Sequence, residues 1–195
     1  MFWAKARYKR EGKKDYLGIK GGIVMGAQGK RVILLVEEMY NEFEFWYPYY
    51  RLKEAGAEVV VVGSGSSMIY KSKMGIPCTV DENAEAVLPS SFDGIIIPGG
   101  YAPDHMRRYP PMVDLVKDLF NAGKVVAAIC HAGWMLASAD ILKGRTVTSF
   151  FAIKDDLVHA GAKWVDEQVV VDGKLITSRK PDDLPAFMRA VLAQL

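Results

Sequence analysis

The stretch that decides the fold is Val125-Val-Ala-Ala-Ile-Cys130-His131-Ala-Gly-Trp134. An apolar, β-branched segment stops at a cysteine, small residues lie two positions before and after that cysteine, and a helix-forming stretch follows. This layout is typical of a nucleophile elbow, with Cys in the place that the G-x-S-x-G pattern gives to Ser. Such a turn lifts the nucleophile above the sheet, beside helix N–H groups that favour a thiolate over a thiol.

The same cysteine also fits a structural role. A free Cys at the end of a buried strand is often no more than a small hydrophobic residue. The elbow by itself therefore leaves two interpretations of Cys130 open, and the rest of the chain has to decide between them.

Size and composition predict one soluble domain. The chain has 195 residues, half of them hydrophobic and a quarter charged, and it contains no apolar run long enough to cross a bilayer. The N-terminus lacks the apolar core of a secretory signal. Only two cysteines occur, Cys78 and Cys130, which is too few for a disulfide-stapled scaffold, and we interpret Cys78 as structural. We expect a cytoplasmic protein without membrane partners.

Positive charge is concentrated at the N-terminus. Residues 1–30 hold eight Lys and Arg against two acidic residues, a net +6 that leaves −4 for residues 31–195. We interpret residues 1–29 as a basic extension and residues 30–195 as a single domain. The extension is consistent with a solvated arm, an expression remnant or a start codon ahead of Met25. Nucleic acid is not the expected partner, because no recognition fold accompanies the charges.

From residue 30 onward, apolar strands alternate with helical segments. This alternation predicts an α/β fold with a mostly parallel sheet covered by helices on both faces. In such sheets the active crevice lies at the carboxyl ends of the strands. The expected strands cover 31–36, 58–62, 94–98, 125–129 and 145–149, the expected hairpins 67–81 and 168–178, and the expected helices 44–55, 111–122, 131–139, 154–160 and 184–195.

Several segments at those strand ends contain groups that a cysteine nucleophile needs. Gly99-Gly100 follows a buried strand, so its N–H groups either approach a ligand or form a plain turn. The acid-rich run 37–44 is either a solvated helix start or a source of a carboxylate partner. His131 is the natural proton carrier, but neighbouring side chains on regular backbone do not face each other. Asp104 and His105 are possible orienting partners for it.

Signals for cofactors are missing from the sequence. Three histidines and two cysteines show no metal-ligand spacing, so no metal site is expected. Neither a P-loop nor a G-x-G-x-x-G pattern occurs, so no nucleotide cofactor is expected.

Several motifs together resemble the ThiJ/PfpI superfamily, and within it the intracellular protease I branch. The resemblance covers roughly residues 30–195 and excludes the basic extension. The motifs that carry it are Tyr47-Pro-Tyr-Tyr-Arg-Leu-Lys-Glu-Ala-Gly56, Pro98-Gly-Gly-Tyr-Ala-Pro-Asp104, Ala128-Ile-Cys-His-Ala-Gly133 and Lys154-Asp-Asp156.

The resemblance implies a flavodoxin-like three-layer sandwich, similar to class I glutamine amidotransferases, that assembles into dimers or hexamers. It implies that Cys130 is the nucleophile and that Glu44 hydrogen-bonds its sulfur and keeps the thiol pKa low. It further implies an oxyanion hole from the N–H groups of Gly100 and His131. The matching position for the acid that aligns His131 from a neighbouring subunit is Asp104.

Three positions depart from the pattern of the branch. Asp104 stands where the branch usually has Glu, one methylene longer. Asn41 replaces a second glutamate, and Phe150 replaces a tyrosine often found near the nucleophile. The Cys130–Glu44 pair is unaffected by these departures.

These observations lead to a cofactor-independent cysteine hydrolase as the expected function. Its substrates would be small carbonyl adducts, as in glyoxalases and deglycases, or peptides, as in the intracellular proteases. The alternative is a redox-sensing stress protein or chaperone in which Cys130 is an oxidation site. A binding protein that uses this fold without catalysis is a further alternative, since fold does not fix function.

Overall fold

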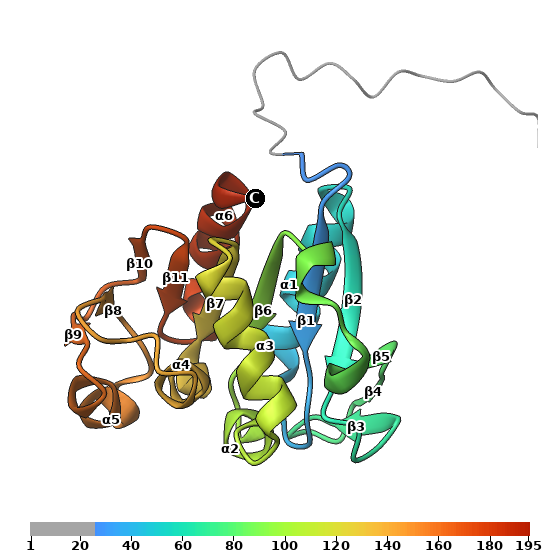
Figure 1. Cartoon of the computed structure of the whole chain (residues 1–195), viewed down its shortest axis with the longest axis horizontal. Helices are drawn as coiled ribbons and strands as arrows, with labels where there is room; N and C mark the ends of the chain where they lie inside the picture. Colours follow the sequence, from blue (N-terminus) through green and yellow to red (C-terminus); the bar gives the residue numbers. More distant parts are fainter. Residues whose placement is uncertain (1–25) are drawn as a thin grey trace, which may run out of the picture.

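The structure, a computed structural model, describes residues 26–195 and is built around a seven-stranded sheet (Figure 1). The strand order is β10-β11-β7-β6-β1-β2-β5, and all neighbours are parallel except β10 and β11. These strands are β1 (Arg31–Leu35), β2 (Glu58–Gly63), β5 (Glu82–Asn83), β6 (Gly94–Ile97), β7 (Val125–Ile129), β10 (Val169–Asp172) and β11 (Leu175–Ser178).

Helices cover both faces of this sheet. α1 and α6 pack together against β2, β7 and β11, while α3 and α4 pack on β6 and β7 from the opposite face, with α3 in front in Figure 1. The expected flavodoxin-like three-layer sandwich is confirmed. The helices are α1 (Glu42–Glu54), α2 (Ala102–Met106), α3 (Pro110–Asn121), α4 (Gly133–Ser138), α5 (Lys154–His159) and α6 (Leu184–Gln194).

Local sequence explains the main elements. The central strands β6 and β7 are buried at every position, as expected for strands covered on both sides. Asn41 caps α1, since its side chain accepts hydrogen bonds from the N–H groups of Phe43 and Glu44. Proline occupies the first turn of α3, where its missing N–H costs nothing.

Two small sheets lie outside the central one. The expected hairpin at 67–81 forms β3 (Ile69–Lys71) and β4 (Pro77–Thr79). The expected strand at 145–149 shortens to β8 (Thr146–Val147), which pairs with β9 (Lys163–Trp164) and not with the central sheet. The place beside β7 is taken by β11, and Asp172 holds the Thr146 N–H at 2.8 Å.

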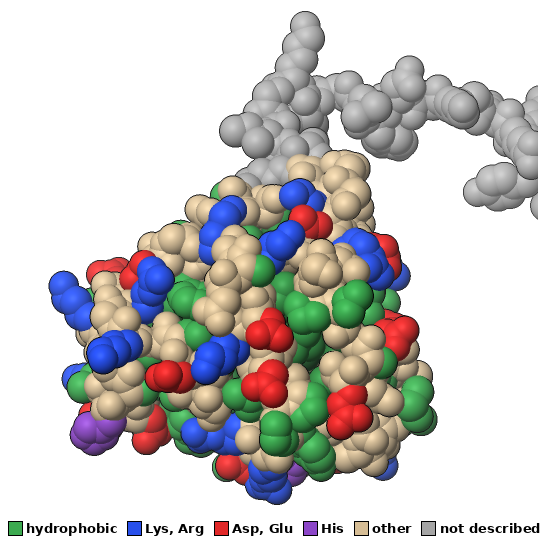
Figure 2. All heavy atoms as spheres, viewed as in Figure 1, with side chains coloured by type: hydrophobic (Ala, Val, Ile, Leu, Met, Phe, Trp, Pro, Cys, Tyr) green, Lys and Arg blue, Asp and Glu red, His purple; other side chains and the backbone are tan. Residues whose placement is uncertain are grey.

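In Figure 2, basic and acidic side chains are interspersed on the visible face. No helix within residues 26–195 is both long enough and apolar enough to cross a membrane. Ala27 packs in the core, and its N–H donates to Ala55 O at 2.7 Å. Residues 1–25 of the basic extension expected over residues 1–29 lie outside the described residues.

Candidate active site

The site is built on the sharp turn that follows β7. Cys130 has φ +63°, a left-handed conformation that is rare for a residue other than glycine. The chain passes through a 3₁₀ turn (Cys130–Ala132) directly into α4, and Ala128 and Ala132 are buried where the strand and helix backbones crowd. The elbow that the sequence predicts is therefore present, with its strained residue at the cysteine.

Two backbone N–H groups are directed at Cys130. Those of His131 and Gly100 lie close enough to the sulfur that each lowers the pKa of Cys130. Gly100 has φ +81°, and a Cβ there would lie 2.5 Å from Met39 O. A Cβ on Gly99 would lie 2.6 Å from Glu44 Oε2 and 2.8 Å from Cys130 Cβ. Only the glycine pair allows the two donors and the carboxyl group to surround the sulfur.

Glu44 lies in the first turn of α1 and is completely buried. The Gly99 N–H donates to its Oε2 at 2.8 Å, while Oε1 has no hydrogen-bond partner among the described residues. Burial raises the pKa of Glu44 to about 7, although the hydrogen bond from Gly99 opposes the shift. A carboxyl group that titrates near neutral pH is suited to accept and return a proton.

The pKa of the Cys130 thiol differs from the sequence-based prediction. Burial raises the pKa of Cys130 to about 12, and the charge of Glu44 acts in the same direction. The predicted low pKa is not supported, because burial outweighs the two N–H donors. Above about pH 7 the Cys130–Glu44 pair holds one proton, on the sulfur, with a free carboxylate beside it.

His131 reaches the sulfur despite being its sequence neighbour. The left-handed turn brings His131 Nδ1 within 3.3 Å of Cys130 Sγ. Neighbouring side chains on regular backbone do not face each other, but on this turn they do. The ring stacks on Phe150 and meets Trp134 edge-on, with centroids 4.9 and 5.2 Å away. Burial and the nearby positive charge of Lys73 lower the pKa of His131, so the imidazole is neutral at pH 7.

Asp104 lies elsewhere in this chain. It sits in α2, half-exposed, and forms an ion pair with Arg108 one helical turn later. Among the described residues neither Asp104 nor His105 hydrogen-bonds to His131. A role for Asp104 across a subunit interface stays a prediction.

The sulfur opens into a cavity of about 320 Å³. Sequence reasoning gave no role to four members of its lining, Lys73, Tyr101, Lys180 and Pro181, although Tyr101 lies within the Pro98–Asp104 motif. No local motif marks the other three, because they come from the β3–β4 hairpin and the segment after β11. The full lining is Asn41, Glu44, Lys73, Gly100, Tyr101, Cys130, His131, Phe150, Lys180 and Pro181.

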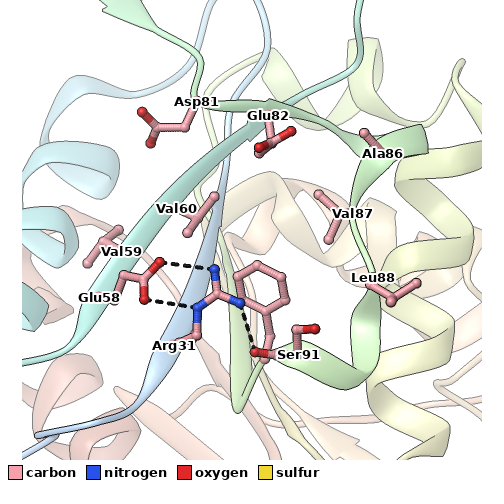
Figure 3. A pocket seen from close by; sticks show the side chains of 11 residues that line it. Arg31, Glu58, Val59, Val60, Asp81, Glu82, Ala86, Val87, Leu88 and Ser91 are labelled. Atoms are coloured by element: carbon pink, nitrogen blue, oxygen red, sulfur yellow. Dashed lines mark hydrogen bonds and ion pairs between the residues drawn. The ribbon is translucent and has the colours of Figure 1, made fainter.

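A larger cavity, of about 460 Å³, lies beside the first residues of β1 and β2 (Figure 3). Arg31 fills part of it, bonded to both carboxylate oxygens of Glu58 at 2.9 and 3.0 Å and to Ser91 O. Its charge is already paired and no cysteine or histidine lines this cavity, so we do not interpret it as the reactive centre. Within residues 26–195 no group of three His, Cys, Asp or Glu side chains is arranged to hold a metal ion.

Known proteins are similar to this chain over most of its length. A deglycase of Pyrococcus abyssi is 45% identical over 159 residues, covering 82% of this chain and 95% of its own. Protein/nucleic acid deglycase 2 of Escherichia coli is 39% identical, covering 85% and 98% of the two chains.

A solved structure extends the comparison to three dimensions. A two-domain protein of Anabaena variabilis with DJ-1/ThiJ/PfpI-like and ferritin-like domains superposes with a TM-score of 0.83 at 45% identity. The match covers 84% of this chain and 47% of that protein, so the chain spans about half of its length. A profile of the DJ-1/PfpI family matches residues 30–194. The chain therefore belongs to the DJ-1/PfpI family.

Proposed function

We propose that this protein is a cofactor-independent cysteine hydrolase of the deglycase type, which releases amines and thiols from 2-oxoaldehyde adducts. The main observation in support is that one buried carboxyl group, two N–H donors and a neutral imidazole surround the Cys130 sulfur. The deglycase names of the relatives from Pyrococcus abyssi and Escherichia coli support the same reaction class.

The first step uses Cys130 and Glu44. The sulfur bonds to the carbinol carbon of an adduct such as R–NH–CH(OH)–CO–CH₃, and the bond from that carbon to nitrogen breaks. Glu44 takes the thiol proton and returns it to the leaving amine. The products of this step are the free amine and a hemithioacetal on the enzyme.

The second step moves a proton within the bound fragment. Glu44 removes the proton from the carbinol carbon and returns it to the adjacent carbonyl carbon, by way of an enediolate, while the hydroxyl proton passes from the carbinol oxygen to the former carbonyl oxygen. The N–H groups of Gly100 and His131 stabilise the negative oxygen of that intermediate. The hemithioacetal becomes a lactyl thioester, so one carbon is oxidised and its neighbour reduced without an external oxidant.

Hydrolysis completes the cycle. Water attacks the thioester, the carbon–sulfur bond breaks, and lactate leaves with the thiol restored. His131, with Nδ1 near the sulfur, is placed to accept the proton from water. The balance is adduct plus water to amine plus lactic acid.

The competing functions are less well supported. A cavity of about 320 Å³ suits a small adduct better than an extended peptide. Oxidation of cysteine follows exposure and thiolate character, whereas Cys130 is buried and its pKa is raised, which disfavours the oxidation-sensor alternative.

We also propose a homo-oligomer in which Asp104 of a neighbouring copy aligns His131. The half-exposed carboxylate of Asp104 is compatible with such a contact. An Asp104→Asn variant would then lose activity only where subunits assemble.

The decisive experiment compares the two cysteines. Cys130→Ala should lower deglycation of a methylglyoxal-modified N-acetyl-lysine by at least about a thousandfold, because the nucleophile is gone. Cys78→Ala is the matched control and should keep most of the activity. Circular dichroism checks the fold of both variants. Full activity in a folded Cys130→Ala protein would refute the proposed function.

A further inference from the structure

The cavity at Cys130 carries a positive charge that the proposed chemistry does not use. Lys73 lines the cavity, and its charge lowers the pKa values of both Glu44 and His131, so it lies near the reacting groups. No salt bridge to Lys73 is found within residues 26–195. The Nζ atom of Lys73 lies 5.9 Å from the centroid of the Tyr101 ring.

Backbone pairing fixes the position of this lysine. The Lys73 N–H donates to Tyr40 O at 2.9 Å, and the Met39 N–H donates to Lys71 O at 2.8 Å. The same Met39–Tyr40 segment pairs on its other side with Gly100, and the Tyr101 N–H donates to Met39 O at 2.9 Å. A continuous backbone ladder therefore joins the lysine to an N–H donor of the site.

A second lysine on the cavity is less available. Lys180 Nζ lies 3.1 Å from a carboxylate oxygen of Asp182, and both side chains are exposed. Its charge is partly compensated, whereas that of Lys73 is free to meet a ligand. Both lysines line the cavity, together with the buried carboxyl group of Glu44.

We propose that Lys73 is a specificity-determining residue that selects adducts whose carrier bears an anionic group. The inference rests on the proposed function and names its substrate class. A carboxylate or a phosphate on the released amine or thiol would meet Lys73 while the adduct carbon lies at Cys130. Small charged carriers, such as free amino acids or nucleotides, would then be preferred over neutral ones.

The test uses pairs of substrates that differ only in charge. Methylglyoxal hemithioacetals of N-acetylcysteine and of its neutral amide form the carboxylate pair. The aminocarbinols of O-phosphoethanolamine and ethanolamine form the phosphate pair. In the wild type we expect kcat/KM to favour the anionic member by about tenfold, the range of a charge-assisted contact that stays partly hydrated. A preference in only one pair would identify which anion is recognised.

Variants then assign the preference to one residue. Lys73→Met should bring the anionic-to-neutral ratio of kcat/KM to about one, mainly through KM, and Lys73→Arg should restore it. Lys71→Met is the matched control, because it removes an exposed lysine of the same hairpin that does not line the cavity. A ratio that stays unchanged in Lys73→Met would overturn the assignment.

Failure of the two proposals can be told apart. Suppose that Cys130→Ala abolishes turnover of the neutral adduct, but wild type and Lys73→Met have equal anionic-to-neutral ratios of kcat/KM. That result would refute only the role of Lys73. Turnover of both adducts that survives Cys130→Ala would refute the hydrolase mechanism itself. Loss of the preference for anionic adducts at high salt would support an electrostatic contact between Lys73 and the substrate.

Discussion

Cys130 and Cys78 lie in different regions of one small protein, yet burial raises the pKa of both thiols to about 12. Cys78 sits in the β3–β4 hairpin, where its thiol donates to Thr79 O at 3.6 Å. Cys130 sits in the turn after β7, with a carboxyl group, two N–H donors and an imidazole around it. Burial is common to both residues, so burial cannot be what separates a reactive cysteine from an inert one.

The difference lies in what each region places beside the sulfur. At the carboxyl end of the sheet, β6, β7 and the start of α1 bring separate groups to one point. The hairpin contains no comparable convergence of strand ends. From this comparison we expect Cys130 to depend on a neighbouring base to lose its proton. Two predictions examine that dependence, and a third examines the backbone at the two cysteines.

The largest effect is expected from Glu44→Gln, which removes the carboxyl group beside Cys130 and leaves the two N–H donors and the imidazole in place. An amide cannot accept the thiol proton, so we expect kcat/KM to fall by about a hundredfold or more. In the wild type, kcat/KM should rise as pH increases through about 7, where Glu44 ionises, and the variant should lack this limb. Glu54→Gln, on the exposed side of α1, is the control. Wild-type rates in Glu44→Gln would mean that another group deprotonates the sulfur.

The same substitution should increase stability at alkaline pH. The folded-state pKa of Glu44, about 7, lies above its ordinary value of 4.5, so folded protein binds the extra proton between these values and loses stability as pH rises through them. At pH 8 we expect Glu44→Gln to exceed the wild type by on the order of 2 kcal/mol in free energy of unfolding. Near pH 4 the two should agree. Urea unfolding at both pH values measures this, and a pH-independent difference would contradict it.

The smallest effect concerns the backbone at the two cysteines. At Cys130, with φ +63°, glycine should be more stable than alanine by about 1 kcal/mol, because glycine adopts left-handed backbone without strain. At Cys78, inside β4, the order should reverse by about 1 kcal/mol, because glycine weakens a strand. Urea unfolding of the four variants checks the two signs. Alanine more stable than glycine at position 130 would show that the turn at Cys130 is not strained.

Much of the fold follows from local sequence. The runs that became β6 and β7, and β1 after its first residue Arg31, are apolar, and a central parallel strand buries such a run on both faces. The short pair β8 and β9 could not be placed, because two-residue strands are determined by distant partners such as Asp172. The five-residue helix α2 was also not predicted from the sequence.

Part of the site could also be predicted from local sequence. Cys130 and Gly100 follow buried strands, so their convergence could be expected from the sheet alone. Glu44 was one of several carboxylates in an acid-rich run, and only the family resemblance singled it out. The raised pKa of Cys130 could not be read from sequence, because it reflects how completely the folded chain excludes water. Lys73 reaches the cavity through hairpin pairing that no local pattern encodes.

The ladder that joins Lys73 to Gly100 has a consequence for how this enzyme could be diversified. The hairpin that supplies Lys73 belongs to neither the central sheet nor the helical layers. Its tip can therefore be exchanged as a separable module, with only its backbone pairing to Tyr40 preserved. Libraries that vary residues 72–76 should alter which substrates enter the cavity while Cys130 and Glu44 stay unchanged.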